Sequence, residues 1–302
     1  MFFGPIRDIA EKFNIMQSAM ASSERIFQLL DKSREDHYER LQPVVTKDDL
    51  IGKIEFKNVW FAYNKDEWIL KDVSFQVEPG ETVALVGATG SGKSTMLNLV
   101  MKFYEIQKGS ILLDGINIRN FDRYNLRKHI AMVLQDVFLF SGDIQQNIRL
   151  NNDSISFEYL KKVANTVRAD KFINRLKGQF NHKVEENGGT LSQGQRQLVS
   201  FARALAFQPK ILILDEATAN IDSETEKWIQ EALEELMQER TAVVVAHRLS
   251  TIRSANKIIV MHRGRIHEIG NHEALMQKKG LYYKLYQLQF KKQESSFDTI
   301  PD

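Results

Sequence analysis

The chain has 302 residues, 43% of them apolar and 26% charged, which is the composition of a globular protein that buries about 75% of its unfolded surface. Its 41 basic and 39 acidic side chains leave a formal charge of +2, which argues against a dedicated nucleic-acid binder. No cysteine is present, so we exclude disulfides and thiolate metal sites and expect a reducing, cytosolic setting. No apolar run reaches the roughly 18–20 residues of a membrane-spanning helix, so we expect a soluble chain.

Residues 1–30 are predicted to form an amphipathic helix. Apolar residues recur there at three-, four- and seven-residue intervals, and Pro5 suits a first helical turn. The apolar positions are Ile6, Ile9, Phe13, Met16, Met20, Phe27 and Leu30. Such a helix can simply pack on its own domain, so the spacing leaves its partner open. The charged residues that follow, 31–50, include Pro43 and predict a linker.

A compact domain is predicted over residues 51–290. Apolar and polar residues alternate over 53–60 and 73–77, before Pro79 and Gly80 turn the chain. This alternation indicates half-exposed strands of an antiparallel sheet.

A glycine-rich loop follows the apolar run 82–86. Residues 87–95, Gly-Ala-Thr-Gly-Ser-Gly-Lys-Ser-Thr, fit the pattern G-x-x-x-x-G-K-S/T. The glycines let the backbone turn tightly and aim its N–H groups at phosphate oxygens. Lys93 would neutralise the β- and γ-phosphates, and Ser94 would offer a hydroxyl to Mg²⁺. The helix that follows presents its positive end to the anion. The alternative, an ordinary strand-to-helix turn, is disfavoured by the Lys-Ser ending, so the loop predicts a site for a magnesium nucleotide.

A second helix start lies at residues 191–197, Leu-Ser-Gln-Gly-Gln-Arg-Gln, ahead of a helical pattern over 198–207. Ser192 is a suitable N-cap and Gly194 would let the backbone approach a ligand closely, which makes this helix start an anion site. The segment alone would be an ordinary capped helix. Because the glycine-rich loop already surrounds one side of the phosphates, a second anion site suggests a nucleotide closed over by another subunit.

Two acids end the apolar run 211–214. Four aliphatic residues leading into Asp215 and Glu216 indicate a strand buried on both faces of a parallel sheet, with the acids at its carboxyl edge, where such sheets bind ligands. Asp215 could hold Mg²⁺ through water, and Glu216 could polarise the attacking water, an assistance worth about 10²–10⁴ in rate. A helix cap is the alternative role of this pair. The apolar strand 241–246 and the helical stretch 224–238 complete the pattern of a covered parallel sheet.

Three histidines near the end of the domain, His262, His267 and His272, recur every five residues. Residues 263–264, Arg-Gly, lie between apolar runs and predict a hairpin turn, and in a strand a spacing of five puts successive side chains on opposite faces. We therefore predict no metal site here. The polar tail, 291–302, is predicted to be disordered.

In this order the motifs resemble the ATP-binding cassette domain of ABC transporters, specifically the type found in multidrug exporters. The resemblance covers residues 5–290 and identifies 87–95 as the Walker A loop, 211–216 as the Walker B strand and 191–195 as the signature motif. It implies an α/β fold, in which a P-loop ATPase core with a mixed or parallel sheet carries an antiparallel β subdomain and a helical signature subdomain. It also implies a magnesium-dependent ATPase with ATP and Mg²⁺ as its ligands.

Four further residues match motifs of this family. Gln135 in Val-Leu-Gln-Asp resembles the Q-loop glutamine, which senses Mg²⁺ and the attacking water. Tyr63 resembles the aromatic residue that stacks on adenine, a contact worth about 1–3 kcal/mol by analogy with nucleic-acid stacking. Asp222 resembles the D-loop aspartate at the dimer interface, and His247 resembles the switch histidine that contacts the γ-phosphate.

The resemblance thus implies a set of site residues. The ATP-binding residues would be Tyr63, Gly87, Thr89, Gly90, Ser91, Gly92, Lys93, Ser94 and Thr95 of one chain with Ser192, Gly194 and Gln195 of its partner. The catalytic residues would be Gln135, Glu216 and His247, and the residues that hold Mg²⁺ would be Ser94, Gln135 and Asp215.

The resemblance also implies a mechanism. Two such domains associate head to tail with ATP between them, and hydrolysis loosens the pair so that attached membrane domains return to their other orientation. Residues 138–141 after Gln135 look like an apolar socket for the coupling helices of the membrane domain, and residues 186–189 are a further exporter-type feature. Residues 1–30 look like the cytoplasmic end of the last membrane helix. The chain then resembles the severed cytoplasmic portion of a half-transporter, held at the inner face of the cell membrane.

Four positions depart from the commonest family pattern. Gln193 stands where glycine is usual, Asn220 replaces a small residue, Asp143 replaces a usual threonine, and Glu185 occupies a usual glycine position. None of these removes a catalytic group of this chain, so we predict hydrolysis. Gln193 and Asn220 leave a heterodimer with a dissimilar partner as open as a homodimer.

Two other classes of function share the nucleotide motifs. Soluble cassette proteins act in translation or DNA repair, but repair-type ATPases separate the two motifs by long coiled coils, and no sustained heptads occur here. Translation-type cassettes hold two nucleotide domains in one chain, whereas this sequence shows one. A nucleotide-gated interaction module that binds without turnover would be favoured by loss of Glu216 or His247, and both are present.

Overall fold

The computed structural model describes residues 3–31, 50–65, 67–185, 188–215, 222–246 and 248–289, in two units, Met1–Leu41 and Gln42–Asp302. The described part of the first unit forms helix α1 (Phe3–Leu30), which begins two residues before Pro5. Most of the predicted linker and all of the predicted tail lie outside the described residues. In the part of the chain that is described, no helix combines the length and the hydropathy that crossing a bilayer needs.

An antiparallel sheet with the strand order β2-β1-β4-β5 forms one layer of the second unit. Its strands are β1 (Ile54–Ala62), β2 (Trp68–Val77), β4 (Lys108–Leu113) and β5 (Ile116–Asn117). Ile54 of β1 pairs with Val77 of β2 on one side and with Leu113 of β4 on the other. The predicted antiparallel strands are confirmed, but both run longer than predicted because register irregularities interrupt the alternation on which the prediction rested.

The central layer is a mixed sheet with the strand order β12-β11-β3-β10-β9-β6. Its strands are β3 (Thr82–Val86), β6 (Ile130–Val133), β9 (Ile211–Asp215), β10 (Thr241–Val245), β11 (Lys257–His262) and β12 (Arg265–Gly270). Neighbouring strands are parallel except β11 and β12, which form the predicted hairpin. Because β3 and β9 both lie beside β10, the ends that carry the two nucleotide motifs reach the same edge of the sheet.

Successive residues of the parallel strands point into two different cores. Val83, Leu85, Ile211, Ile213, Val243 and Val245 belong to the core shared with the antiparallel sheet and helix α2 (Lys93–Val100). Ala84, Val86, Leu212, Leu214, Ala242 and Val244 belong to the core shared with the helices on the other face. Side chains of a strand alternate in direction, so these strands are buried on both faces, as their continuous apolar runs predicted.

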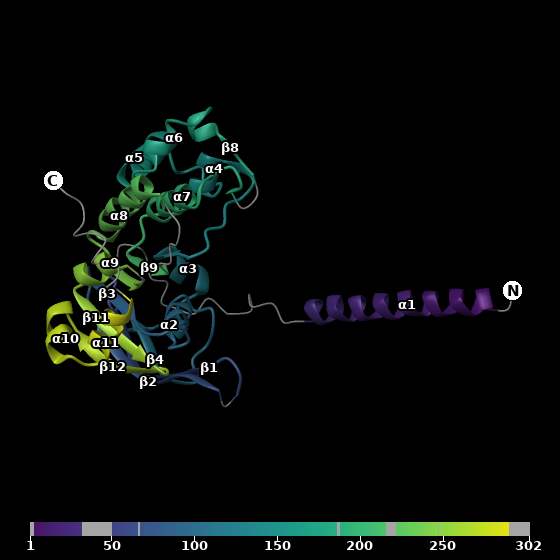
Figure 1. Cartoon of the computed structure of the whole chain (residues 1–302), viewed down its shortest axis with the longest axis horizontal. Helices are drawn as coiled ribbons and strands as arrows, with labels where there is room; N and C mark the ends of the chain where they lie inside the picture. The colour runs from purple at the N-terminus through teal and green to yellow at the C-terminus, as the bar shows by residue number, and fades with distance from the viewer. Residues whose placement is uncertain are drawn as a thin grey trace. The chain divides into compact units, whose positions relative to one another are not determined.

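Helices share the core on that second face, with α7 packed against β6, and extend away from the sheet as the helical subdomain. They are α4 (Ile144–Arg149), α5 (Phe157–Thr166), α6 (Asp170–Ile173), α7 (Gln193–Ala206) and α8 (Ser223–Met237), with the 3₁₀ turn η4 (Gln179–Asn181) and the short strands β7 (Gly142–Asp143) and β8 (Lys183–Val184). The other elements are η3 (Ile118–Asn120), α3 (Arg123–Lys128), α9 (Leu249–Ser254), α10 (His272–Lys278) and α11 (Leu281–Gln289). Within the second unit, α5 and α6 lie at one end and β1 and β2 at the other (Figure 1).

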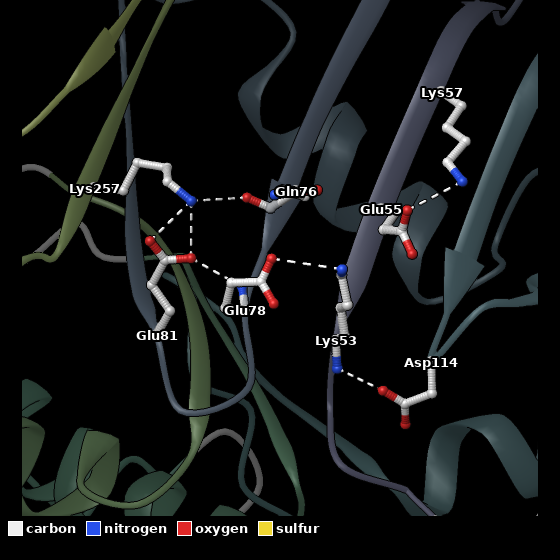
Figure 2. Close-up of polar contacts among 8 residues, drawn as sticks. All are labelled: Lys53, Glu55, Lys57, Gln76, Glu78, Glu81, Asp114 and Lys257. Atoms are coloured by element: carbon white, nitrogen blue, oxygen red, sulfur yellow. Dashed lines mark hydrogen bonds and ion pairs between the residues drawn. The ribbon is translucent and has the colours of Figure 1, made fainter.

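Polar contacts join the two sheets near the start of β3 (Figure 2). Lys257 of β11 donates to the carbonyl oxygen of Gln76 in β2 at 3.0 Å and to a carboxylate oxygen of Glu81, just ahead of β3, at 2.9 Å. Glu81 also accepts from the backbone N–H of Glu78 at 2.8 Å. These contacts hold the antiparallel sheet beside the strand that leads into the glycine-rich loop.

Candidate nucleotide site

The glycine-rich loop joins the end of β3 to the start of α2 and curls against the β11–β12 hairpin. Gly92, the residue before α2, has a φ of 102°, a left-handed conformation that favours glycine. A Cβ on Gly87 would clash with the backbone carbonyl of Met261 in β11. In the hairpin turn, the N–H of Gly264 donates to the carbonyl of Ser91 at 3.2 Å. The sequence predicted the hairpin but did not reveal that it supports the loop.

The side chain of Lys93 lies within the curve of this loop. Its Nζ donates to the carbonyl oxygens of Gly87 at 2.7 Å and of Ala88 at 3.1 Å. Burial lowers the pKa of Lys93, and the nearby Asp215 carboxylate opposes this shift. A buried ammonium group in the first turn of a helix provides the positive charge that a phosphate group needs there.

The hydroxyl of Ser91 is an unpaired polar group in the loop. The residue is 4% exposed, and among the described residues its Oγ has no hydrogen-bond partner. Since buried polar groups are nearly always paired, this hydroxyl fits a site whose ligand supplies the missing partner. The neighbouring Thr89 and Gly90 are exposed to solvent.

The start of α2 and the end of β9 meet through two side chains. Ser94 Oγ donates to Oδ2 of Asp215 at 3.3 Å. Val133 of β6 pairs with Leu214 of β9, so Gln135, two residues past β6, leaves the sheet at the same edge as Asp215, and its side chain is exposed. Hydroxyl, carboxylate and carboxamide oxygens are ligands that Mg²⁺ accepts in proteins. The donor set therefore fits the magnesium ion predicted from the sequence.

Tyr63 follows β1 and reaches the first turn of α2. Its hydroxyl donates to Oγ1 of Thr95 at 3.3 Å. The residue is 46% exposed, which leaves ring surface on which a flat base can stack. The structure thus gathers Tyr63, the loop 87–95 and Asp215 around one edge of the central sheet.

Ser192 begins helix α7 and forms a capping box with Gln195. The Oγ of Ser192 accepts from the N–H of Gln195 at 3.3 Å, and Oε1 of Gln195 accepts from the N–H of Ser192 at 3.0 Å. The pattern S-x-x-Q in the sequence could have predicted this reciprocal pair. Ser192 and Gln193 are exposed, whereas Gly194 is buried in the helix. The exposed hydroxyl at the helix start is available to a second molecule.

The remaining predicted site residues are Asp222, which begins helix α8, and Glu216 and His247, which fall outside the described residues. Asp222 caps α8 by accepting from the N–H of Thr225 at 2.9 Å, and hydrogen bonds from Thr225 lower the pKa of Asp222. Glu216 directly follows β9 and His247 comes two residues after β10, but both fall outside the described residues, as do Asn220 and residues 186–187. Their roles stay predictions.

A cavity of about 900 Å³ lies between α3, the segment after β6 and α7. Its lining includes the apolar side chains of Leu134, Phe138 and Phe207, together with Tyr124, Arg127, Lys128 and Arg203. Of the apolar socket predicted at 138–141, Phe138 lines this cavity, whereas Leu139 is buried in the helical core. The aromatic ring of Phe140 packs against that of Phe138, with 5.0 Å between centroids.

Asp143, one of the departures from the family pattern, caps helix α4. Its carboxylate accepts from the N–H of Gln146 at 2.8 Å, and Oε1 of Gln146 accepts from the N–H of Asp143 at 3.1 Å. Threonine and aspartate both serve as N-caps, so this substitution preserves the local structure.

The histidines of the hairpin correct one expectation. The rings of His262 and His267 lie 5.3 Å apart, not on opposite faces, because the turn at 263–264 places them on paired strands. His272 lies elsewhere, with its Nδ1 2.7 Å from the hydroxyl of Tyr282. Within the described residues, no group of three or more His, Asp or Glu side chains is arranged to hold a metal ion.

Comparisons with known proteins identify relatives of the chain. Residues 70–219 match the family model described as ABC transporter. The probable multidrug resistance ABC transporter ATP-binding/permease protein YheH of Bacillus subtilis (strain 168) is 49% identical over 287 residues, which are 95% of this chain and 42% of that protein. The ATP-dependent lipid A-core flippase of Haemophilus influenzae is 45% identical over 290 residues, 95% of this chain and 48% of the flippase.

A solved structure agrees with these relatives. It is described as a bacterial Atm1-family ABC exporter with ATP bound, and it matches 92% of this chain and 48% of the exporter chain with a TM-score of 0.81 and 34% identity. The chain therefore spans less than half the length of each of these three proteins. The resemblance seen in the motifs is confirmed: the chain belongs to the ABC transporter family, as a nucleotide-binding domain of the exporter type.

Proposed function

We propose that the chain binds ATP with Mg²⁺, hydrolyses it as half of a nucleotide-sandwiching dimer, and so powers export through a membrane domain. The observation that carries this proposal is the Ser94–Asp215 hydrogen bond, because it joins a hydroxyl to a carboxylate that also acts on the buried ammonium of Lys93. The relatives described as ATP-binding/permease proteins and the exporter described with ATP bound support it.

Binding of the triphosphate would use groups that the loop already presents. The loop N–H groups and the unpaired Ser91 hydroxyl would donate to phosphate oxygens, and Lys93 would exchange its two loop carbonyls for phosphate. Mg²⁺, when bound, would neutralise charge on the β- and γ-phosphates. Ser94, Asp215 and Gln135 would hold it there.

Hydrolysis would depend on the two residues that follow the buried strands. Glu216, directly after Asp215, would orient and polarise the attacking water, and His247, after β10, would contact the γ-phosphate. The strands β9 and β10 are parallel neighbours, so their carboxyl ends lie at the same edge of the sheet, which favours this assignment.

A second nucleotide-binding domain would complete the site. The exposed Ser192 at the start of α7 would face the partner's nucleotide, with Gly194 and Gln195 shaping the same turn and Asp222 at the interface. The partner can be a second copy or a different chain, since Gln193 stands at the exposed turn where a glycine is usual in the family.

The membrane domain would dock through its coupling helices in the cavity beside Phe138. The apolar lining of this cavity, about 900 Å³ in volume, suits the apolar face of an amphipathic helix, and basic side chains stand at its wall. Residues 1–30 would continue the last membrane helix, which would place the domain at the cytoplasmic face of the cell membrane.

Two measurements test the proposal together. Phosphate release from ATP by the 302-residue chain should require Mg²⁺ and should vanish in Lys93→Met. Light scattering should show the Glu216→Gln variant as a dimer with ATP and as a monomer with ADP, because only the triphosphate spans both halves. A chain that releases no phosphate with Mg²⁺ present, or a Glu216→Gln variant that stays monomeric with ATP and every candidate partner, contradicts the proposal.

A further inference from the structure

Tyr63 is one of three aromatic residues whose rings are in contact. Its ring centroid lies 4.8 Å from that of Phe61, at an interplanar angle of 87°, and 4.9 Å from that of Tyr104, at 86°. The rings of Phe61 and Tyr104 are 5.8 Å apart. Phe61 is 2% exposed, whereas Tyr63 and Tyr104 are each 46% exposed. A buried ring therefore anchors two half-exposed ones.

The three rings come from two distant segments. Phe61 and Tyr63 lie at the end of β1 and in the bend that follows, whereas Tyr104 lies in the turn between α2 and β4. Because Tyr63 stands beyond the last residue of β1, strand pairing does not fix its side chain. Its ring contacts those of Phe61 and Tyr104, and its hydroxyl donates to Thr95.

We propose that Tyr104 is a positioning residue that holds the ring of Tyr63 ready to stack on the base of the nucleotide. Perpendicular ring contacts are favoured by the charge distribution of aromatic rings, so Tyr104 and Phe61 restrain Tyr63 from two sides. A ring that is already restrained loses less conformational freedom when the ligand binds, which strengthens binding. The inference rests on the proposed function, since it needs a nucleotide at Tyr63.

Phe103 offers a matched control. It neighbours Tyr104 in sequence and is 44% exposed, but its ring lies under the guanidinium of Arg127, 4.7 Å from the centroid. Phe103→Leu thus removes a similar ring from the same turn without touching the Tyr63 cluster. Tyr104→Phe is the conservative variant, because it keeps the ring and removes only the hydroxyl.

The test compares these variants by steady-state ATP hydrolysis. Tyr104→Leu should raise KM for MgATP about two- to tenfold, the factor that corresponds to one aromatic pair, with kcat changed less than about twofold. Tyr104→Phe and Phe103→Leu should keep KM near that of the unsubstituted chain. Competitive inhibition by tripolyphosphate should be equal in all variants, because this probe has no base and contacts only the phosphate loop.

A double-substitution cycle isolates the contact between the two tyrosines. In a Tyr63→Leu background, Tyr104→Leu should raise KM no further, since the ring it positions is gone. The proposal is overturned if Tyr104→Leu leaves KM unchanged, raises KM equally in both backgrounds, or weakens tripolyphosphate inhibition by the same factor.

Two further outcomes are separated by design. If Tyr104→Leu melts below the assay temperature, Tyr104→Met takes its place, since its flexible side chain fills a similar space without a ring. Failure of the proposed function would appear as no ATP hydrolysis by the unsubstituted chain, whereas failure of this inference would leave that hydrolysis intact with an unaltered KM in the Tyr104 variants.

Discussion

The hydroxyl of Ser94 donates to the carboxylate of Asp215 at 3.3 Å, although 121 positions separate the two residues in the sequence. Ser94 is the second residue of α2 and Asp215 the last residue of β9, so each lies where its element meets the edge of the central sheet. The bond joins the two nucleotide motifs directly, without an intervening residue. Under the proposed function Mg²⁺ would be held here, since both oxygens are suitable for that ion.

Asp215→Asn should raise the Mg²⁺ concentration needed for half-maximal ATP hydrolysis by about 10–100-fold, because the carboxamide keeps the shape of the side chain but loses its charge. The measurement is a Mg²⁺ titration at fixed ATP. Ser94→Ala should act in the same direction, and Ser94→Thr, which keeps a hydroxyl, should stay near the unsubstituted chain. An unaltered Mg²⁺ requirement in Asp215→Asn would show that this carboxylate does not help to hold the ion.

Glu216→Gln should lower phosphate release by about 10²–10⁴-fold while leaving the affinity for MgATP within about twofold, because the variant loses a base but no phosphate-binding group. Lys93→Met should instead weaken MgATP binding itself, since it removes the buried ammonium inside the loop. Equilibrium binding of a fluorescent ATP analogue, measured beside phosphate release, separates these effects. Equal loss of affinity in both variants would contradict the assignment of Glu216 to hydrolysis.

The parts of the site that could be predicted are those encoded in one continuous segment. The strand, loop and helix around 82–95 and the buried strand 211–215 are each specified by local pattern, because apolar runs, glycines and the Lys-Ser ending act within a few residues. Their placement at a common sheet edge followed from the rule that parallel strands present their carboxyl ends together.

The contacts between segments could not be predicted, because they depend on how distant elements pack. No local pattern indicates that Gly264 donates to Ser91, or that Tyr104 meets Tyr63. The expectation that His262 and His267 lie on opposite faces was wrong for a related reason, because the alternation rule for one strand does not apply across a turn. The capping box at 192–195 was encoded in the sequence as S-x-x-Q but was predicted only in part.

Ser192→Asp should separate capping from nucleotide recognition. Aspartate caps a helix as well as serine does, so the free energy of unfolding should stay within about 0.5 kcal/mol, whereas Ser192→Ala should lose about 1 kcal/mol. A carboxylate facing the partner's γ-phosphate would repel it, so Ser192→Asp should abolish the ATP-dependent dimer of the Glu216→Gln variant, as measured by light scattering.

Ser156, the N-cap of α5, provides the control for this prediction. Its Oγ accepts from the N–H of Tyr159 at 3.2 Å in the same manner, but the resemblance assigns it no part in nucleotide binding. Ser156→Asp should therefore keep both stability and dimer formation. ATP-dependent dimers of Ser192→Asp as tight as those of Ser156→Asp would show that Ser192 does not face a phosphate.

Tyr282 should make the stability of the domain depend on alkaline pH. The side chain is fully buried, its hydroxyl lies 2.7 Å from Nδ1 of His272, and burial raises the pKa of Tyr282 above its usual range. The folded chain therefore holds the phenolic proton more tightly than the unfolded chain, in which tyrosine titrates at about pH 10. This stabilisation is fully present below about pH 10 and is lost as the pH rises towards the raised pKa, by up to about 1.4 kcal/mol per pH unit.

Tyr282→Phe should lose that part of the alkaline slope, whereas the exposed Tyr124→Phe should keep it, and urea unfolding at several pH values between 8 and 11 measures the difference. Equal slopes in the two variants would mean that Tyr282 ionises as easily in the folded chain as in the unfolded one.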